Sequence, residues 1–186
     1  MEAGISYFPM FVDLEGKHVL AVGAGTIGSR RILTLLKFGA QVTAVDPDGR
    51  KLKEMEGWNG LSWIREPYEA YRTRLLEKAP DFFMVLTATG NRETDLLAVS
   101  DGRRMGAFVN AAADRSLSDF YFPGIACAGS VTAGVTTGGE DHRLAKRACE
   151  EIRAFLSERE ESWQKDEKEK GEDKITDKEE SRSDER

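Results

Sequence analysis

Short apolar runs alternate with segments of helical spacing over most of the chain. The run from His18 to Val22 is short enough for a buried strand, and Arg30 to Phe38 has apolar residues at helical spacing before Gly39. A second apolar run, Val42 to Val45, ends in Asp46. The alternation continues with predicted strands at 61–64, 82–87 and 108–111 and predicted helices at 68–78 and 93–105. Strands that alternate with helices predict an α/β fold, with a Rossmann-type parallel sheet covered on both faces.

The pattern changes after Asn110. Two short runs of small residues, 125–128 and 131–136, flank Gly129-Ser130 and predict a β-hairpin. A helix is predicted at 141–156 because its apolar residues form one stripe, with Asp141 as a possible N-cap. A hairpin and one amphipathic helix are not stable alone, so they must pack on the Rossmann-type sheet or on another copy of the chain.

The predicted first strand and helix are joined by Gly23-Ala24-Gly25-Thr26-Ile27-Gly28. In this context the glycines allow a tight turn, close approach of a pyrophosphate and close packing of the helix, and an acid after the second strand binds ribose hydroxyls. Asp46 would repel a 2′-phosphate, which favours NAD over NADP. The alternative is a Rossmann-like domain with an empty site. The predicted cofactor-binding residues are Gly23, Gly25, Thr26, Ile27, Gly28, Asp46, Pro47, Thr87, Ala88, Thr89 and Asn110.

Composition and charge exclude several classes of protein. No apolar run approaches the length of a membrane span, and the N-terminal residues do not have the pattern of a signal peptide. Most of the formal net charge of −6 lies in Ser157 to Arg186, which contains 13 acids and 8 bases, so a nucleic-acid-binding surface is not expected. Cys127 and Cys149 have no metal or redox spacing and predict free thiols in a reducing cytoplasm. His18 and His142 are too few for a histidine-based metal site, and no metal is expected.

Several longer motifs go beyond a generic nucleotide fold. They are FPMFVDL before the first strand, VGAGTIGSRR, VLTATGN, FVNAAADRSLSDFYFPG and VTAGVTTGG leading to RLAKRACEEIRAFL. Over residues 7 to 156 the chain resembles the precorrin-2 dehydrogenase/sirohydrochlorin ferrochelatase family, the NAD-binding part of siroheme synthase. The resemblance implies oxidation of precorrin-2 to sirohydrochlorin with NAD, with iron insertion in some members. It also implies a homodimer built through the segment after the sheet.

Together, the composition and the resemblance predict three parts of the chain. These are an NAD-binding Rossmann domain at 1–118, a dimerisation segment at 119–158 and a charged tail at 159–186, disordered beyond about Lys170. The substrate would be a tetrapyrrole that carries several carboxylates, so basic residues should face it. Arg115 and Arg143 are better placed than Arg92, Lys146 and Arg147 because they lie in family loops. The predicted substrate-binding residues are Arg115, Thr136, Thr137, Gly138 and Arg143.

The chain departs from the family at one position of catalytic interest. The family has an aspartate three residues after the asparagine that matches Asn110, whereas this chain has Ala113 followed by Asp114. Asp114 is the predicted catalytic residue, and Asp119 is its alternative. The chain also has Asp141-His142 where the family usually has Ser-Pro, and a charged tail where the family usually has a further helical region. Two other functions therefore stay open: a chelatase without oxidation chemistry, and a non-catalytic NAD- or tetrapyrrole-binding dimer.

Overall fold

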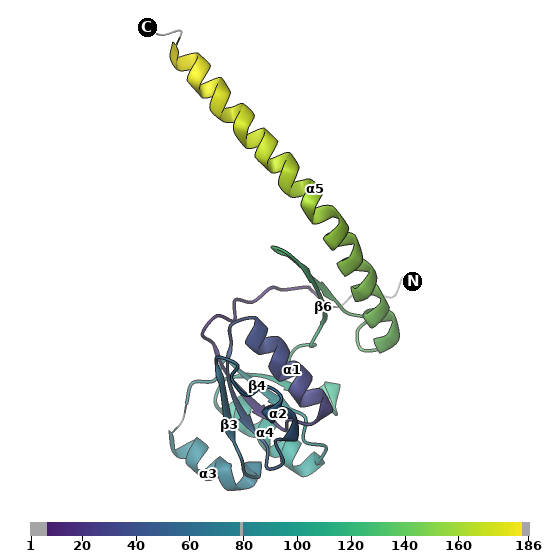
Figure 1. The fold of residues 1–186 in the computed structure, drawn as a ribbon. Coiled ribbons are helices and arrows are strands. Elements are labelled where there is room, and N and C mark those ends of the chain that lie inside the picture. Colours follow the sequence, from purple (N-terminus) through teal and green to yellow (C-terminus); the bar gives the residue numbers. More distant parts are fainter. Residues whose placement is uncertain (1–6, 79, 184–186) are drawn as a thin grey trace. The chain divides into compact units, whose positions relative to one another are not determined.

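The computed structural model describes residues 7–78 and 80–183 (Figure 1). The chain divides into two compact units. The Rossmann unit is Met10–Phe122, and the hairpin-helix unit is Pro123–Arg186 together with the N-terminal segment ending at Pro9. Within the described residues, no helix is both long and apolar enough to cross a bilayer.

The Rossmann unit is built on a five-stranded parallel sheet in the order β3-β2-β1-β4-β5. This order confirms the predicted fold class, because the chain returns to the centre of the sheet between β3 and β4. Phe82 and Phe83 precede β4 although they were predicted within it. The strands are β1 (His18–Val22), β2 (Gln41–Val45), β3 (Leu61–Ile64), β4 (Met84–Thr87) and β5 (Phe108–Ala111).

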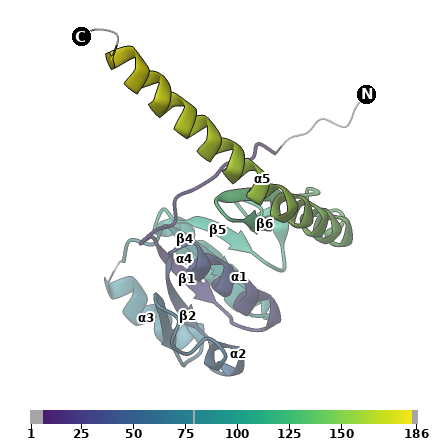
Figure 2. The same ribbon diagram turned by 45° about the horizontal axis from the view of Figure 1, so that its top comes forward.

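The alternating side chains of β1 explain why helices cover both faces of the sheet. Val19 and Ala21 pack with α1 and α2 in one core cluster, whereas Leu20 and Val22 pack with α3 and α4 in another. Figure 2 shows α1 lying across one face of the sheet. The helices are α1 (Thr26–Lys37), α2 (Arg50–Lys53), α3 (Tyr68–Lys78) and α4 (Arg92–Arg104).

Helix α1 begins at Thr26, where the glycine motif predicts the start of the helix. Helix α2 was not predicted, since its four residues are mostly charged and only Leu52 is buried. The predicted cap of α4 is confirmed: the side chain of Asn91 accepts hydrogen bonds from the backbone N–H groups of Glu93 and Thr94.

A buried acid joins α3 to α4. Asp101 is fully buried, and its carboxylate accepts hydrogen bonds from the Tyr68 hydroxyl at 3.0 Å and from Arg72 Nε and Nη2 at 2.5 and 2.9 Å. Burial, and secondarily the Asp101 charge, raises the pKa of Tyr68. Both side chains that bind this carboxylate, Tyr68 and Arg72, belong to α3, so Asp101 fixes how the two helices pack.

The hairpin-helix unit contains the predicted hairpin and helix. β6 (Gly124–Ala128) pairs antiparallel with β7 (Val131–Val135), and α5 spans His142–Ser183. Asp141 caps α5, since its Oδ1 accepts from the N–H groups of Arg143 and Leu144 at 2.9 Å. Helix and hairpin are held together by a hydrogen bond of 2.9 Å from Arg153 to the Ile125 carbonyl.

The tail differs from the expectation of disorder. Helix α5 continues through the predicted boundary at 158 to Ser183, as Figure 1 shows. Glu and Lys, which dominate the tail, are good helix formers, and this gives a physical reason for the difference. The division between the units falls at Phe122–Pro123, a few residues beyond the predicted boundary at 118.

We expect Asp101→Ala to lower the free energy of unfolding by about 3 kcal/mol, because it leaves the Tyr68 hydroxyl and the Arg72 guanidinium without their acceptor. Urea unfolding measures the change. Asp48→Ala is the matched control, since the Asp48–Arg50 pair is exposed and should give no measurable change. Equal effects of the two substitutions would contradict the structural role of Asp101.

Candidate nucleotide and substrate site

The glycine loop lies against the segment that follows β4. Gly23 has φ +90°, and a Cβ atom there would come within 2.6 Å of the Ala88 carbonyl group. A Cβ on Gly28 would overlap the Gly23 carbonyl. By contrast, a Cβ on Gly25 would meet nothing within 4 Å. The loop is therefore closely packed at Gly23 and Gly28 and open at Gly25, which is the arrangement that a pyrophosphate requires.

The start of α1 has neither a side-chain cap nor an acidic residue of its own. Its N-cap is Gly25, which offers no side-chain cap, and its first turn has no acidic residue. Thr26 and Ile27 are exposed there. An uncapped helix start presents backbone N–H donors and the positive end of the helix dipole. Together with the open position at Gly25, this start fits the diphosphate of NAD.

Asp46 connects the glycine loop to the segment after β2. Its Oδ2 accepts a hydrogen bond of 2.6 Å from Ala24 N–H, and its Oδ1 accepts from the N–H groups of Asp48 and Gly49 at 2.8 and 3.0 Å. An ionised carboxylate has about four acceptor positions, so these three bonds leave capacity for a ribose hydroxyl. Pro47, also predicted at this site, is exposed beside it.

A second buried acid, Asp95, organises the segment after β4. Its Oδ1 accepts from the hydroxyl of Thr87, from Thr89 N–H at 3.1 Å and from Thr89 Oγ1 at 2.7 Å. Thr87 is fully buried, so its side chain holds the loop rather than facing a ligand. Asp95 was not predicted as a site residue. The available signal was an acid close to Ala98 and Val99 on the buried face of a predicted helix.

Asn110 lies at the end of β5 and is almost fully buried. Its Oδ1 accepts a hydrogen bond of 2.7 Å from Arg31 Nη1, and its Nδ2 donates one of 2.7 Å to the Phe120 carbonyl. Arg31, on α1, was also not identified as a site residue from sequence. Its position inside the glycine-motif helix was the only hint.

The parallel sheet brings these segments to one edge. Ala88 N–H donates to the Val22 carbonyl at 2.8 Å, and Ala112 N–H donates to the Thr87 carbonyl at 2.8 Å. The glycine loop, the β4 loop and the β5 end therefore lie side by side at the carboxyl edge of the sheet. A hollow of about 400 Å³ lies instead at the amino-terminal edge, lined by His18, Tyr71, Lys78 and their neighbours.

Asp114 caps the short 3₁₀ helix η1 (Arg115–Leu117) just beyond β5. Its Oδ1 accepts from Ser116 Oγ at 2.6 Å and from Ser116 N–H at 3.0 Å, and Arg92 lies 3.8 Å from its Oδ2. The two hydrogen bonds from Ser116, and secondarily Arg92, hold the pKa of Asp114 below its usual value. Asp114 is therefore a partly exposed carboxylate beyond the end of β5, and it is ionised at neutral pH.

Asp119, the alternative, has a different environment. Its Oδ2 accepts from Val109 N–H at 2.8 Å, and its own N–H donates to the Val109 carbonyl at 2.8 Å. Asp119 therefore pairs with the outer edge of β5. This arrangement favours Asp114 over Asp119 for proton transfer.

The predicted substrate residues belong to both units. Arg115 is exposed in η1 of the Rossmann unit. In the hairpin-helix unit, Thr136 Oγ1 accepts from Gly138 N–H at 3.1 Å and Thr137 Oγ1 accepts from Asp141 N–H at 3.2 Å, so both hydroxyls shape the turn before α5. Arg143 is exposed in the first turn of α5.

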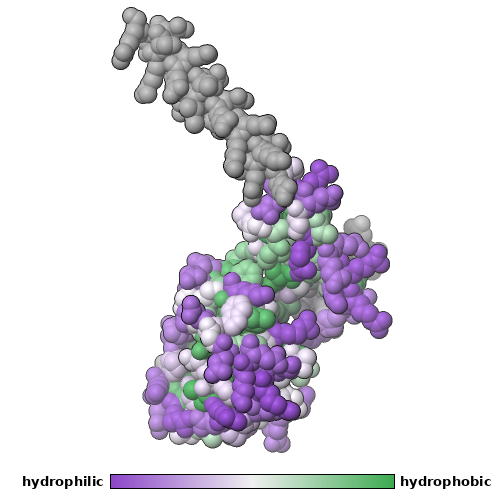
Figure 3. Space-filling view, viewed as in Figure 1, coloured by the Kyte–Doolittle hydropathy of each residue, from purple (hydrophilic) through white to green (hydrophobic). Residues whose placement is uncertain are grey.

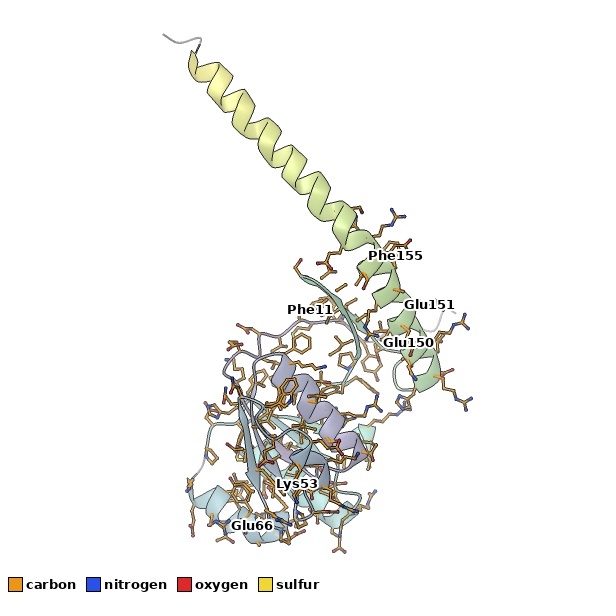
Figure 4. All side chains as sticks on the ribbon, viewed as in Figure 1. Phe11, Lys53, Glu66, Glu150, Glu151 and Phe155 are labelled. Carbon is orange, nitrogen blue, oxygen red and sulfur yellow. The ribbon has the colours of Figure 1, made fainter. Side chains whose placement is uncertain are left out.

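The other basic candidates of α5 have acidic neighbours. Lys146 lies 3.7 Å from Glu150, and Arg147 lies 2.8 Å from Glu151. Figure 4 labels both glutamates on this helix. These exposed pairs are typical of a solvated helix face. Among the residues with described positions, no group of three or more His, Cys, Asp or Glu side chains is placed to hold a metal ion.

Comparison with known proteins supports this description. Residues 10–124 match the model of a family described as "Putative NAD(P)-binding". The solved structure of SirC, a precorrin-2 dehydrogenase, aligns with a TM-score of 0.62 at 26% identity, covering 80% of this chain and 71% of SirC. This alignment confirms the Rossmann-type fold.

Curated relatives belong to siroheme biosynthesis. The "Probable multifunctional siroheme biosynthesis protein HemA" of Ruminiclostridium josui is 36% identical over 148 residues, covering 78% of this chain and 28% of the relative. A siroheme synthase of Neisseria meningitidis serogroup C is 28% identical over 153 residues. The match covers 82% of this chain and 31% of that relative. The chain thus spans about a third of the length of these relatives.

We expect Gly25→Val to abolish NAD binding without lowering the melting temperature. The new side chain meets no protein atom within 4 Å at its Cβ, yet it occupies the position where the diphosphate would approach. Titration calorimetry and thermal unfolding measure the two effects. Gly23→Ala is the contrasting variant: it should destabilise the fold, because φ is +90° and Ala88 is too close. NAD binding by Gly25→Val at the affinity of the wild type would refute this placement.

Proposed function

The chain belongs to the NAD(P)-binding family whose model it matches, and we propose that it oxidises precorrin-2 to sirohydrochlorin with NAD. The observation that carries the proposal is the carboxyl edge of the sheet. The parallel strands bring three features to this edge. They are the open glycine loop after β1, the ribose-binding candidate Asp46 after β2 and the ionised Asp114 beyond β5. The similarity to SirC, a precorrin-2 dehydrogenase, supports the choice of substrate.

The residues of the chain have distinct roles in this proposal. The start of α1 binds the diphosphate, and Asp46 binds the adenosine ribose while it holds the glycine loop through Ala24. NAD, when bound, accepts the hydride that the oxidation removes from a ring carbon. Oxidation also releases one proton for each hydride, so a base must accept it.

We assign the base to Asp114. Its carboxylate is ionised at neutral pH and about a third of its side-chain surface is exposed, so it can accept a proton from a substrate at the edge. The family aspartate is replaced by Ala113, which is exposed one position earlier.

The hairpin-helix unit is proposed to form a homodimer with a second copy of the chain. Arg115, Thr136, Thr137, Gly138 and Arg143 are the proposed substrate ligands. Figure 3 shows hydrophobic residues on the hairpin and the adjacent part of α5. Leu144 and Phe155 are 55% and 52% exposed on this helix, and Phe155 stacks edge-on against Trp163. Such an exposed apolar stripe favours contact with a second copy.

A specific observation supports one alternative function. Because Ala113 removes the family aspartate and Asp114 has a lowered pKa, a non-catalytic dimer that binds NAD or tetrapyrrole is the second candidate. Ferrochelatase activity, with or without oxidation, stays open. The free thiols of Cys127 and Cys149 support the predicted cytoplasmic location.

Anaerobic incubation with precorrin-2 and NAD tests the function, and NADH formation is the readout. We expect Asp114→Asn to lower the rate by about 10²–10⁴-fold, because the amide keeps the shape but cannot accept the proton. Ala113→Asp should raise the rate. Asp119→Asn is the control for the alternative assignment. An Asp114→Asn enzyme with the wild-type rate would exclude Asp114, and NAD binding without turnover that Ala113→Asp restores would favour the non-catalytic function.

The assembly is tested by sedimentation at micromolar concentration. We expect twice the chain mass, and we expect Leu144→Glu with Phe155→Glu to give monomers because the charges disrupt the apolar stripe on α5. Leu96→Glu, at a site 39% exposed on α4, is the matched control and should stay dimeric. Deletion beyond Lys170 should not change the oligomeric state. A monomeric wild type would remove the dimer proposal.

A further inference from the structure

Arg31 is a half-buried cation with neutral neighbours. Its Nη1 donates to the Asn110 side chain at 2.7 Å, and its guanidinium lies 5.4 Å from the centroid of the Phe122 ring. Within the part of the chain that the structure describes, no ion pair joins Arg31 to an acid. Burial lowers the pKa of Arg31 because it disfavours the charged form, so the fold loses free energy by keeping this guanidinium charged.

This environment is unusual within the Rossmann unit. Arg72 is also partly exposed, but it pairs with the fully buried Asp101 at 2.5 Å. A desolvated charge without a counter-charge is unfavourable, and such groups are concentrated at functional sites. The charge of Arg31 is therefore better explained by a ligand than by the fold.

The guanidinium retains donors for such a ligand. It has five N–H groups, and one of its nitrogens is engaged with Asn110. Among the described residues, no fully buried side-chain nitrogen or oxygen lacks a hydrogen-bond partner. The remaining donors of Arg31 therefore reach the surface, where a planar fork can bind both oxygens of a carboxylate.

The position of Arg31 separates it from the diphosphate site. Arg31 is five residues beyond Thr26, which places it about 7.5 Å along the helix from the first turn. Its partner Asn110 belongs to β5, whereas the glycine loop follows β1. The guanidinium thus lies toward β5, the strand that Asp114 follows in the chain.

We propose that Arg31 binds a carboxylate of the tetrapyrrole substrate in a bidentate manner, with Asn110 orienting the guanidinium and Phe122 supporting its face. The inference rests on the proposed function, since it assigns a ligand to the same edge of the sheet. It adds a substrate contact that comes from the glycine-motif helix itself.

The test is fluorescence titration with uroporphyrin, a stable octacarboxylate tetrapyrrole, alongside calorimetric titration with NAD. We expect Arg31→Gln to weaken uroporphyrin binding by about 10- to 100-fold, the loss expected for a charge-assisted hydrogen bond. NAD affinity should stay within about twofold of the wild type, because the diphosphate site is untouched. Arg30→Gln is the matched control: it removes the same charge from the exposed neighbouring position and should leave uroporphyrin affinity unchanged.

Salt dependence separates a charge contact from a structural effect. Uroporphyrin binding by Arg31→Gln should be less sensitive to added salt than binding by the wild type, since one screened attraction is gone. If the Arg31→Gln variant unfolds, uroporphyrin binding is measured with Arg31→Lys instead, which keeps the charge but has no planar fork. Wild-type affinity in that variant would overturn the bidentate contact. Equal uroporphyrin binding by Arg31→Gln and wild type, or a loss confined to NAD, would overturn the inference only. Absence of wild-type uroporphyrin binding would overturn the inference together with the proposed function.

Discussion

The structure of the Rossmann unit depends on a contact between two backbones. At Gly23 and Gly28 the chain after β1 comes so close to itself and to Ala88 that no side chain fits between them. This contact positions the first turn of α1 against the sheet, and Asp46 and Asp95 then fix the loops on either side. The open position at Gly25 is useful only because its neighbours are so closely packed.

The charges of this unit follow a consistent arrangement. The buried acids Asp95 and Asp101 are satisfied by hydroxyl, amide or guanidinium donors within the fold. At the carboxyl edge, the first turn of α1 contains no acidic residue, and no described ion pair joins Arg31 to an acid. These two positive groups favour anionic ligands, and both a dinucleotide and a tetrapyrrole carboxylate are of this kind.

Much of the fold could be predicted from sequence because it depends on local patterns. The strands at 18–22, 61–64 and 108–111, the helix at 68–78 and the cap at Asn91 were predicted correctly. Helix α2 and η1 were missed, since a few charged residues carry no periodic signal. Arg31 and Asp95 were missed for another reason: their roles come from partners far away in sequence or on another element, such as Asn110 and Thr87. Helix α5 continues to Ser183, and the good helix formers Glu and Lys are the reason that a charged segment can take this form.

The side chain of Asn110 has a consequence for the chemical ageing of the protein. One amide accepts from Arg31 with its oxygen and donates to the Phe120 carbonyl with its nitrogen, so the two ends of the group cannot be exchanged. Hydrolysis of this amide to a carboxylate would place a negative oxygen against the Phe120 carbonyl and supply a counter-ion to Arg31. A single deamidation would thus repel the Phe120 carbonyl, which is bound to the Asn110 amide, and would give the Arg31 guanidinium a counter-charge inside the fold.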